Sequence, residues 1–355
     1  MDPIKTIKAK QNQSILSSKE IDFLVSSYSN NQITDEIMTE FLKAVKDNGM
    51  NMDETISLTK TMIDSGEKMD FSHLNSYVAD KHSTGGVGDK VSLILGPLMA
   101  SLGITIPMIA GRSLGHTGGT IDKLETIPGF KTDLSIQEFK NCIEKIGLCI
   151  MSQTDSICPA DKKMYALRDV TNTIDSMPLI CGSIMSKKIA EGIRGLVLDI
   201  KIGNGAFMKN LKDGKDLASK LMKVGGAFNV STDVIFSNMD QPLGRTAGMW
   251  CEVNESINAM NSEGAEDLMN VVYNLGTKML LQAKIVKSAT EARQIQIENI
   301  RNGKALKKFQ QMVKNQSGQI DLGPNINNPS YSHEVVSEHD GYVSSFETTA
   351  IGWVL

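Results

Sequence analysis

The stretch KHSTGGVGDK, residues 81–90, places three glycines and two hydroxyl side chains between a lysine and an apolar run. Such a stretch can wrap an anion, because glycines let backbone N–H groups approach it closely and a following helix contributes its positive end. Lys81 and Ser83 would add charge and a hydroxyl donor, whereas Asp89 is expected to fix the loop. The stretch fits neither a Walker A loop nor GxGxxG, so spacing alone leaves an ordinary turn as an equal alternative.

A second glycine-rich stretch, GRSLGHTGGT at residues 111–120, follows the apolar run 104–109 and precedes a helical pattern. Two such turns after consecutive strands would converge at the carboxyl edge of a sheet, where α/β proteins bind ligands. Thr120 is the better ligand candidate, since it begins the expected helix. A second anion-facing turn is one interpretation. The alternative, which we prefer for His116, is that His116 and Arg112 only stabilise the turn.

A third candidate set combines Arg168 with Ser183 and Lys187, the last two being four residues apart and therefore on one helix face. One guanidinium, one hydroxyl and one ammonium group could converge on a ligand there. Taken alone, the pair Lys187-Lys188 favours a solvated helix face, and Arg168 with Asp169 is equally typical of a surface ion pair.

The patterns around these stretches predict helices first and an α/β sheet afterwards. Residues 1–66 carry helical periodicity, with a capping box at Ser17 and Glu20, a second helix capped by Thr34, and a third that ends at Gly66. Further along, short apolar runs alternate with glycine-rich turns and helical stretches. The expected strands are 104–106, 196–200, 234–236 and 341–343, and the expected helices of this part are 161–168 and 178–190.

The composition bounds the class of protein. The 355 residues are 41% hydrophobic and 22% charged, with a formal net charge of −4. These values fit a globular chain of two packed units and give no sign of a surface that tracks nucleic acid. The N-terminal residues lack the apolar stretch of a signal peptide, no apolar run reaches membrane-spanning length, and the five cysteines form no CxxC pair. We therefore expect a cytoplasmic protein with reduced cysteines and without nucleic-acid or membrane partners.

A resemblance to known sequences decides whether the three candidate stretches are ordinary turns and surface residues or parts of a binding site. KHSTGGVGD at 81–89 and AGRSLGHTGGTIDKLE at 110–125 closely resemble the two glycine-rich signatures of the thymidine and pyrimidine-nucleoside phosphorylases. The sequence is identified as a member of this family, because the resemblance continues in order along almost the whole chain. The further matches are PADK at 159–162, RDVT at 168–171, DIKIG at 199–203, NMDQPLG at 238–244 and DGYV at 340–343.

The resemblance implies an α/β fold of the nucleoside phosphorylase and anthranilate phosphoribosyltransferase type, with a central mixed sheet. A small helical domain, residues 1–66 and 160–192, would carry the dimer contact and the pyrimidine side of the cleft. Residues 67–159 and 193–330 would form the phosphate-binding α/β domain. Residues 331–355 would begin an incomplete C-terminal part, since family members continue for several tens of residues, and its apolar end would leave a sheet edge open.

The family transfers a pentosyl group from a pyrimidine to inorganic phosphate, which attacks C1′ opposite the departing base without a covalent enzyme intermediate. The protein must hold phosphate in line and stabilise negative charge on the base. By resemblance, the phosphate ligands are Lys81, Ser83, Ser92 and Thr120. The pyrimidine contacts are His82, Arg168, Ser183 and Lys187, of which His82, Arg168 and Lys187 are the catalytic residues.

The resemblance also implies phosphate as co-substrate, no required cofactor, a homodimer, and thymidine or deoxyuridine as favoured nucleosides with uridine also accepted. Some family members bind a monovalent cation such as K⁺. Lys90 lies beside the corresponding stretch and would oppose the ion by its charge, and a purely structural role for Glu255 is an equal alternative. The ligands implied by resemblance are Gly88, Leu243, Thr246 and Glu255.

Three departures from the family pattern bear on the hypothesis. Ala110 stands where a serine usually contributes to the phosphate site, which removes a hydrogen bond worth about 1 kcal/mol and weakens phosphate binding severalfold. Ser113 stands where glycine is common, and the chain stops early. The alternatives are an anthranilate-type phosphoribosyltransferase and a catalytically impaired, truncated homologue. Arg168, Ser183 and Lys187 argue against the first, and no lost catalytic residue supports the second.

Overall fold

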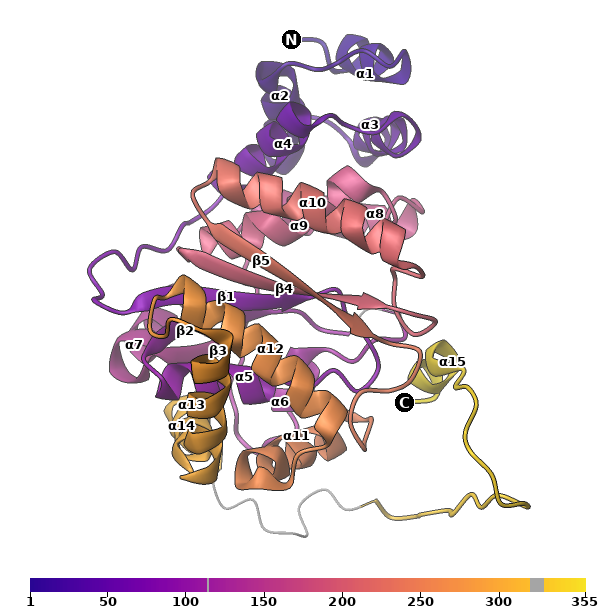
Figure 1. Ribbon diagram of the computed structural model, residues 1–355. Helices are drawn as coiled ribbons and strands as arrows, with labels where there is room; N and C mark the ends of the chain where they lie inside the picture. The colour runs from indigo at the N-terminus through magenta and orange to yellow at the C-terminus, as the bar shows by residue number, and fades with distance from the viewer. Residues whose placement is uncertain (114, 320–328) are drawn as a thin grey trace.

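The computed structural model describes residues 1–113, 115–319 and 329–355, and Figure 1 shows a small helical domain above a larger α/β domain. Four helices at the N-terminus pack with two that return from the middle of the chain. None of the helices in the described residues combines the length and the apolar composition needed to cross a membrane. The six helices are α1 Pro3–Gln11, α2 Ser18–Ser29, α3 Asp35–Asn48, α4 Met52–Asp64, α8 Pro159–Val170 and α9 Met177–Ala190.

Side-chain caps decide where the N-terminal helices begin. The Ser17 hydroxyl accepts from Glu20 N, and the Glu20 carboxylate accepts from Ser17 N at 2.8 Å, so the predicted capping box of α2 is confirmed. Asn51 and Glu54 form the same box at α4. Thr34 precedes α3 as predicted but makes no capping hydrogen bond through its side chain. Helix α1 is an addition to the predicted set.

In the part of the chain that the structure describes, the α/β domain is built on five strands in the order β3-β2-β1-β4-β5. Every pairing among the described strands is parallel, so the expected mixed sheet is wrong in this respect. The physical reason is that helices join each strand to the next, and a crossover of this kind brings the chain back in the same direction. The strands are β1 Tyr77–Ser83, β2 Ile104–Ala110, β3 Leu148–Ser152, β4 Gly195–Ile202 and β5 Ser231–Asn238.

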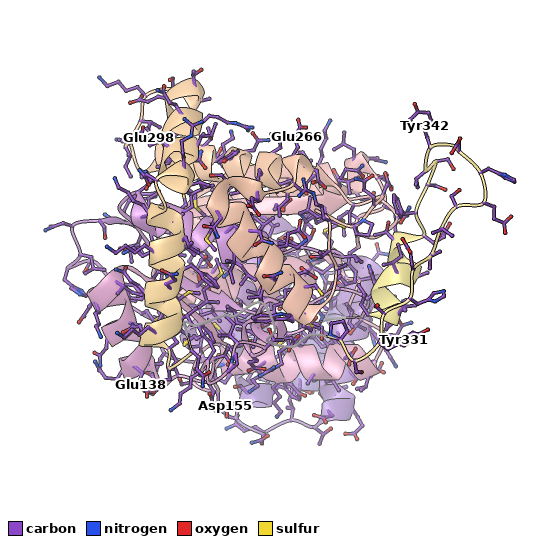
Figure 2. The ribbon with its side chains drawn as sticks, turned by 90° about the horizontal axis from the view of Figure 1, so that it is seen from below. Glu138, Asp155, Glu266, Glu298, Tyr331 and Tyr342 are labelled. Carbon is purple, nitrogen blue, oxygen red and sulfur yellow. The ribbon has the colours of Figure 1, made fainter. Side chains whose placement is uncertain are left out.

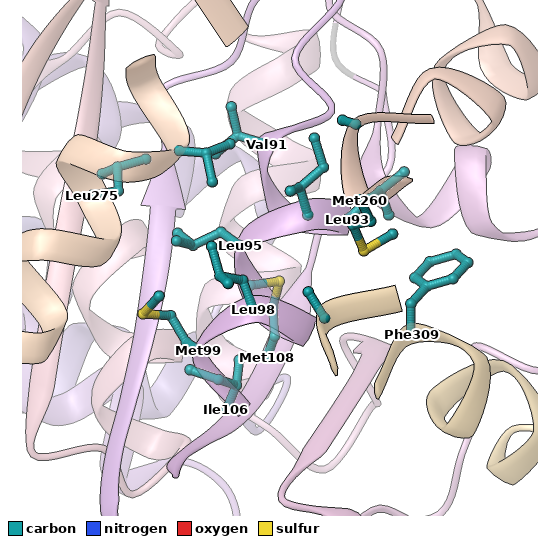
Figure 3. Packing of buried hydrophobic residues seen from close by; sticks show 14 of the residues in the cluster. Val91, Leu93, Leu95, Leu98, Met99, Ile106, Met108, Met260, Leu275 and Phe309 are labelled. Carbon is teal, nitrogen blue, oxygen red and sulfur yellow. The ribbon is translucent and has the colours of Figure 1, made fainter. Parts of the chain in front are cut away.

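Helices cover both faces of the sheet. Figure 3 shows Leu95 and Met99 of α5 packed beside Ile106 of β2, with Leu275 and Phe309 nearby, and these residues belong to one buried cluster. A second cluster on the other face joins the sheet to α7, α9 and α10. The remaining helices are α5 Val91–Ser101, α6 Thr120–Leu124, α7 Ile136–Ile146, α10 Leu211–Ala227, α11 Met249–Asn258, α12 Glu266–Gln282, α13 Ala289–Arg301, α14 Lys304–Asn315 and α15 Thr348–Val354, with a π-helical turn at Ala259–Glu263.

A third buried cluster holds the helical domain together. It contains residues of α1 to α4 with Ala160 and Met164 of α8 and Leu179 of α9. Because α9 also contributes Cys181 and Met185 to the second cluster, this helix belongs to two cores at once. A displacement of α9 would therefore disturb the packing of both buried clusters.

The C-terminal residues differ from the prediction. Tyr342 is fully exposed, and 341–343 pair with no strand among the described residues, so the expected strand is wrong (Figure 2). The chain ends in α15, where Thr348 is buried and donates to Asp240 O at 2.8 Å, while Trp353 packs against the His116 ring. The apolar end forms a short helix and not a strand, and Trp353 and Val354 remain 67% and 87% exposed. Strand β5 has a neighbour on one side only among the described strands, so an open sheet edge stays a prediction.

Candidate active site

Strand β1 presents polar residues to two sides of the molecule. Side chains alternate along a strand, so Asp80 and His82 face one side and Lys81 the other. Asp80 accepts a hydrogen bond from Lys188 of α9, whereas the Lys81 ammonium group donates to Ser92 Oγ of α5 at 3.3 Å. The end of β1 therefore carries one polar set toward α9 and another toward α5.

The side toward α5 is organised around Asp89. Its Oδ2 accepts from Ser83 Oγ at 2.5 Å, and its Oδ1 lies 3.9 Å from Lys81 Nζ. Ser83 Oγ in turn accepts from Gly85 N at 3.1 Å, which closes the turn. Burial opposes ionisation of Asp89, but the neighbouring ammonium groups, Lys201 first, outweigh burial and lower the pKa of this carboxyl. Asp89 thus fixes the loop, as predicted.

The second glycine-rich stretch meets the first. A Cβ atom on Gly85 would lie 3.4 Å from the Thr117 side chain, and Lys123 Nζ of α6 donates to Asp89 O at 2.8 Å. The predicted convergence of two turns at the carboxyl edge of the sheet is therefore confirmed. Thr120 stands at the first position of α6, beside this junction.

Arg112 and His116 hold the second turn in place. Arg112 donates to Asp122 at 2.9 Å and to both carboxylate oxygens of Glu125, at 2.6 and 2.8 Å. His116 Nε2 shares a hydrogen bond with Gly205 O at 2.8 Å. These contacts agree with the turn-stabilising alternative for both residues.

Arg168 is an internal group. Its side chain is almost fully buried, and its guanidinium donates to the backbone carbonyls of Leu179 at 3.2 Å, Ile174 at 2.7 Å and Thr173 at 3.4 Å. Burial lowers the pKa of Arg168, although Asp161 opposes the shift. The alternative of a surface ion pair with its sequence neighbour is therefore wrong, and the three carbonyls orient the guanidinium.

Lys187 is held by two oxygens. Its Nζ donates to Asp161 Oδ2 at 2.5 Å and to Ser183 Oγ at 2.9 Å, and its side chain is 22% exposed. Lys188 beside it is buried. The solvated helix face that the residues alone favoured is therefore wrong, because Lys187 is held by Asp161 and Ser183 and Lys188 is buried against Asp80 of the sheet.

His82 lies close to these positive charges. Burial lowers the pKa of His82 well below its ordinary value, and the ammonium groups of Lys188, Lys81 and Lys187 lower it further. The imidazole is therefore neutral at pH 7, with one N–H donor and one acceptor nitrogen. Because side chains alternate along β1, His82 lies on the Asp80 face of the strand, the face toward α9.

Comparisons with known proteins agree with this architecture. Residues 4–66 match the helical bundle domain of the glycosyl transferase family, and residues 75–306 match its a/b domain. A pyrimidine-nucleoside phosphorylase of Staphylococcus haemolyticus is 42% identical over 355 residues, which cover 99% of this chain and 82% of the relative. The chain belongs to the pyrimidine-nucleoside phosphorylase family. Phosphorylases of that name from Geobacillus stearothermophilus and Staphylococcus aureus are 41% and 40% identical over the same shares.

The fold of this phosphorylase family extends to other enzymes. Anthranilate phosphoribosyltransferase from Thermus thermophilus aligns with a TM-score of 0.71 over 88% of this chain and 99% of that one, at 13% identity. At this identity the likeness concerns the fold alone. The predicted architecture, a small helical domain with a larger α/β domain, is confirmed.

Two buried charged residues of the DIKIG stretch, to which the sequence analysis assigned no role, lie beside the first glycine-rich turn. Lys201 Nζ donates to Asp199 Oδ2 at 2.6 Å and lies 3.9 Å from Asp89, while Ser237 Oγ donates to Asp199 Oδ1 at 2.5 Å. The sequence does contain a pattern that could have predicted the importance of Asp199 and Lys201. Two charged residues at alternate positions of an otherwise apolar strand share one face, and this face is the one that carries Lys81.

A second buried group lies on the opposite face. Lys188 Nζ donates to Asp80, to Ile109 O at 2.9 Å and to Glu191 Oε1 at 2.7 Å, and Ile109 N donates to the same Glu191 oxygen at 3.0 Å. Burial raises the pKa of Glu191 well above its ordinary value against the pull of Lys188. This cluster ties α9 to β1 and β2.

The residues of the predicted K⁺ site do come together, but around Lys90. Lys90 Nζ donates to Leu243 O and Thr246 O at 2.8 Å and to Glu255 Oε2 at 2.7 Å. Gly88 O accepts from Lys90 N at 2.9 Å. Each residue of the predicted ligand set thus accepts a hydrogen bond from Lys90. These residues therefore do not fit an additional monovalent cation.

Two departures from the phosphorylase pattern can be placed. Ala110 ends β2 beside Ser152 of β3. Ser113 N donates to Asp122 Oδ2 at 2.7 Å, and Ser113 does not occur among the described residues with positive φ. Its Cβ therefore causes no left-handed backbone strain where the family commonly has glycine.

Proposed function

We propose that this chain cleaves pyrimidine nucleosides by phosphorolysis, releasing the free base and a pentose 1-phosphate. The division of polar groups at the end of β1 carries the proposal. Lys81 is directed toward α5 and the glycine-rich turns, whereas His82 is directed toward α9 and Lys187. A pentose bound across the end of β1 would have phosphate on one side of C1′ and the base on the other, as in-line displacement requires.

We assign phosphate binding to Lys81, Ser83, Ser92 and Thr120. Lys81 is 4% exposed, and burial lowers the pKa of its ammonium group although Asp89 and other carboxylates oppose the shift. A phosphate anion beside it would favour the charged form and accept strong charge-assisted hydrogen bonds. Asp89 would hold Ser83 and Lys81 in position rather than act as a base, because phosphate is already an anionic nucleophile.

The remaining site residues are assigned to the pyrimidine. A phosphate oxygen forms a bond to C1′ as the C1′–N1 bond breaks, and the electron pair of that bond moves onto the base, which later takes a proton from solvent. Negative charge reaches the ring oxygens, where Arg168 and Lys187 donate hydrogen bonds. Donation that strengthens as the charge develops lowers the barrier. Neutral His82 donates near O2, and Ser183 contacts the ring edge.

Substrate range and assembly complete the proposal. Thymidine and deoxyuridine are the favoured nucleosides, with uridine accepted, and the chain forms a homodimer through residues 1–66 and 160–192. Ile4 and Ile15 of this helical domain are 47% and 72% exposed, which is apolar surface that a partner copy would cover. All five cysteines are free, as in proteins of reducing compartments such as the cytoplasm. A constant monomer mass in light scattering across protein concentrations would exclude the dimer.

A product assay tests the activity. Thymidine, deoxyuridine and uridine are each incubated with the full chain, with and without inorganic phosphate, and the free base and sugar phosphate are quantified by chromatography. Equal amounts of base and pentose 1-phosphate, formed only with phosphate, are expected. Base release without phosphate would indicate hydrolysis instead. Turnover of anthranilate with a phosphoribosyl pyrophosphate donor would favour the phosphoribosyltransferase alternative.

A further inference from the structure

Lys90 lies at a junction of segments that are far apart in the chain. Its side chain has no exposed surface, and its ammonium group donates to Leu243 O, Thr246 O and Glu255 Oε2 at 2.7 to 2.8 Å. A lysine ammonium group carries three N–H donors, so each donor has an acceptor. Protein oxygens therefore satisfy all three donors of the ammonium group.

Glu255 is fixed from several directions. Besides Lys90, its carboxylate accepts from Arg245 N at 2.8 Å, Thr246 N at 2.9 Å and the Thr246 hydroxyl at 2.7 Å. Burial alone would raise the pKa of Glu255, but these hydrogen bonds outweigh burial and lower it. The carboxylate is therefore charged, and Lys90 supplies a positive charge in direct contact with it.

The loops at this junction approach each other closely. Gly88 has a φ of 72°, and a Cβ atom on it would lie 2.6 Å from Leu243 O, so glycine is required. The carbonyls of Leu243 and Thr246 thus converge next to the first glycine-rich turn. An ammonium group and K⁺ carry the same charge and bind the same kind of oxygen, and two such charges in one buried site repel strongly. The Lys90 ammonium group and a K⁺ ion therefore cannot both be bound at this junction.

We infer that the Lys90 ammonium group takes the place of a monovalent cation at this junction, so that the chain needs no K⁺ to fold or to turn over. The lysine is covalently attached and cannot dissociate. It directly follows Asp89, which holds Ser83 and Lys81. The position of Asp89, and with it the proposed phosphate ligands Ser83 and Lys81, therefore does not depend on which cations are in solution.

Two matched variants test the inference. Lys90→Ser removes the charge and leaves the ring of oxygens with room for an ion, whereas Lys90→Met fills the same space with an uncharged chain of similar length. Melting temperatures are measured for the full chain and both variants in equal concentrations of choline, sodium or potassium chloride. These melts need no activity, so their outcome is distinct from that of the proposed function.

The unaltered chain should melt at the same temperature in choline and potassium chloride. Lys90→Ser should melt several degrees lower in choline chloride and recover saturably with potassium chloride, as binding to the folded state requires. Lys90→Met should melt lower and show no recovery. If Lys90→Ser shows no recovery with any alkali cation, the junction is not a cation site and the inference fails.

Direct binding to the unaltered chain provides a test that does not depend on the variants folding. Equilibrium dialysis against radioactive rubidium should show no saturable binding by the unaltered chain. Saturable uptake of about one ion per chain, or a melting temperature that potassium raises above its value in choline, would overturn the inference. The phosphate KM should likewise be equal in choline and potassium chloride.

Discussion

Lys187 Nζ donates to Asp161 Oδ2 at 2.5 Å, which ties α9 to the first turn of α8. Asp161 is almost fully buried, and its carboxylate fixes the position of the Lys187 ammonium group next to Ser183. The proposed function depends on this arrangement, because a lysine that rotates away cannot donate to the leaving pyrimidine.

Asp161→Asn should therefore lower turnover although it touches no substrate. A misplaced catalytic group costs up to about 100-fold, and we expect a decrease of about 10- to 100-fold in kcat with an unchanged phosphate KM. Asp155→Asn is the control, since its carboxylate is 92% exposed and pairs with Lys162 at the surface (Figure 2). Equal rates for the two variants would show that Asp161 does not position Lys187.

Arg168→Ala and Lys187→Ala should each reduce kcat far more than phosphate affinity. Their charges matter most when the base becomes anionic, and loss of one such donor costs about 100- to 1,000-fold. Arg168→Lys should rescue little, because an ammonium group does not reproduce the planar fork that three carbonyls orient. Steady-state kinetics with both substrates varied provide the measurement. A parallel loss of phosphate affinity would reverse the assignment.

Lys81→Ala should chiefly raise the phosphate KM. A hydrogen bond to a charged group contributes about 1.5 to 3 kcal/mol, so an increase of about 10- to 100-fold is expected. Lys209→Ala is the control, since Lys209 is exposed and its ammonium group donates only to Asn204 O among the described residues. Phosphate titrations at saturating nucleoside give the comparison, and an unchanged phosphate dependence would remove Lys81 from the site.

His82 should make the chain less stable as the pH falls. Burial and nearby ammonium groups lower the pKa of His82 well below that of the unfolded chain, which is about 6.5. Below that pH the unfolded chain binds more protons than the folded one, so stability falls with decreasing pH until the folded-state pKa is reached. His82→Asn should therefore lose less melting temperature between pH 7 and pH 5 than the unaltered chain. His73→Asn is the control, because its side chain is 56% exposed, and it should lose as much melting temperature as the unaltered chain. If His82→Asn lost just as much, His82 would not be the group that makes stability depend on pH.

Lys188→Met should destabilise the fold strongly. Removal of the ammonium group leaves the buried Asp80 carboxylate without its cation and takes a hydrogen-bond donor from Glu191, and breaking a buried pair costs about 3 to 5 kcal/mol. Urea denaturation measures the free energy of unfolding, with Lys223→Met on the exposed face of α10 as the control. A change as small as that of the control would mean that the cluster contributes no net stability.

Much of the fold could be predicted because local spacing encodes it. The capping box at Ser17 and Glu20 is a short-range pattern, and the apolar runs that became β2, β4 and β5 lie between turn residues. Patterns that resemble a strand locally fail when no partner strand lies beside them, as at 341–343. The direction of strands depends on crossovers between distant segments, and for that reason the mixed sheet was predicted wrongly.

The order of residues in β1 is a property of the sequence alone: alternation along a strand necessarily separates Lys81 from His82, whatever surrounds them. Partners are decided only in the folded chain. Lys187 and Lys188 are adjacent and chemically identical, yet one meets Asp161 and the other meets Asp80. Lys90 finds Glu255 across 165 positions. A buried charge must be paired, and only packing of distant elements decides which oxygens lie within its reach.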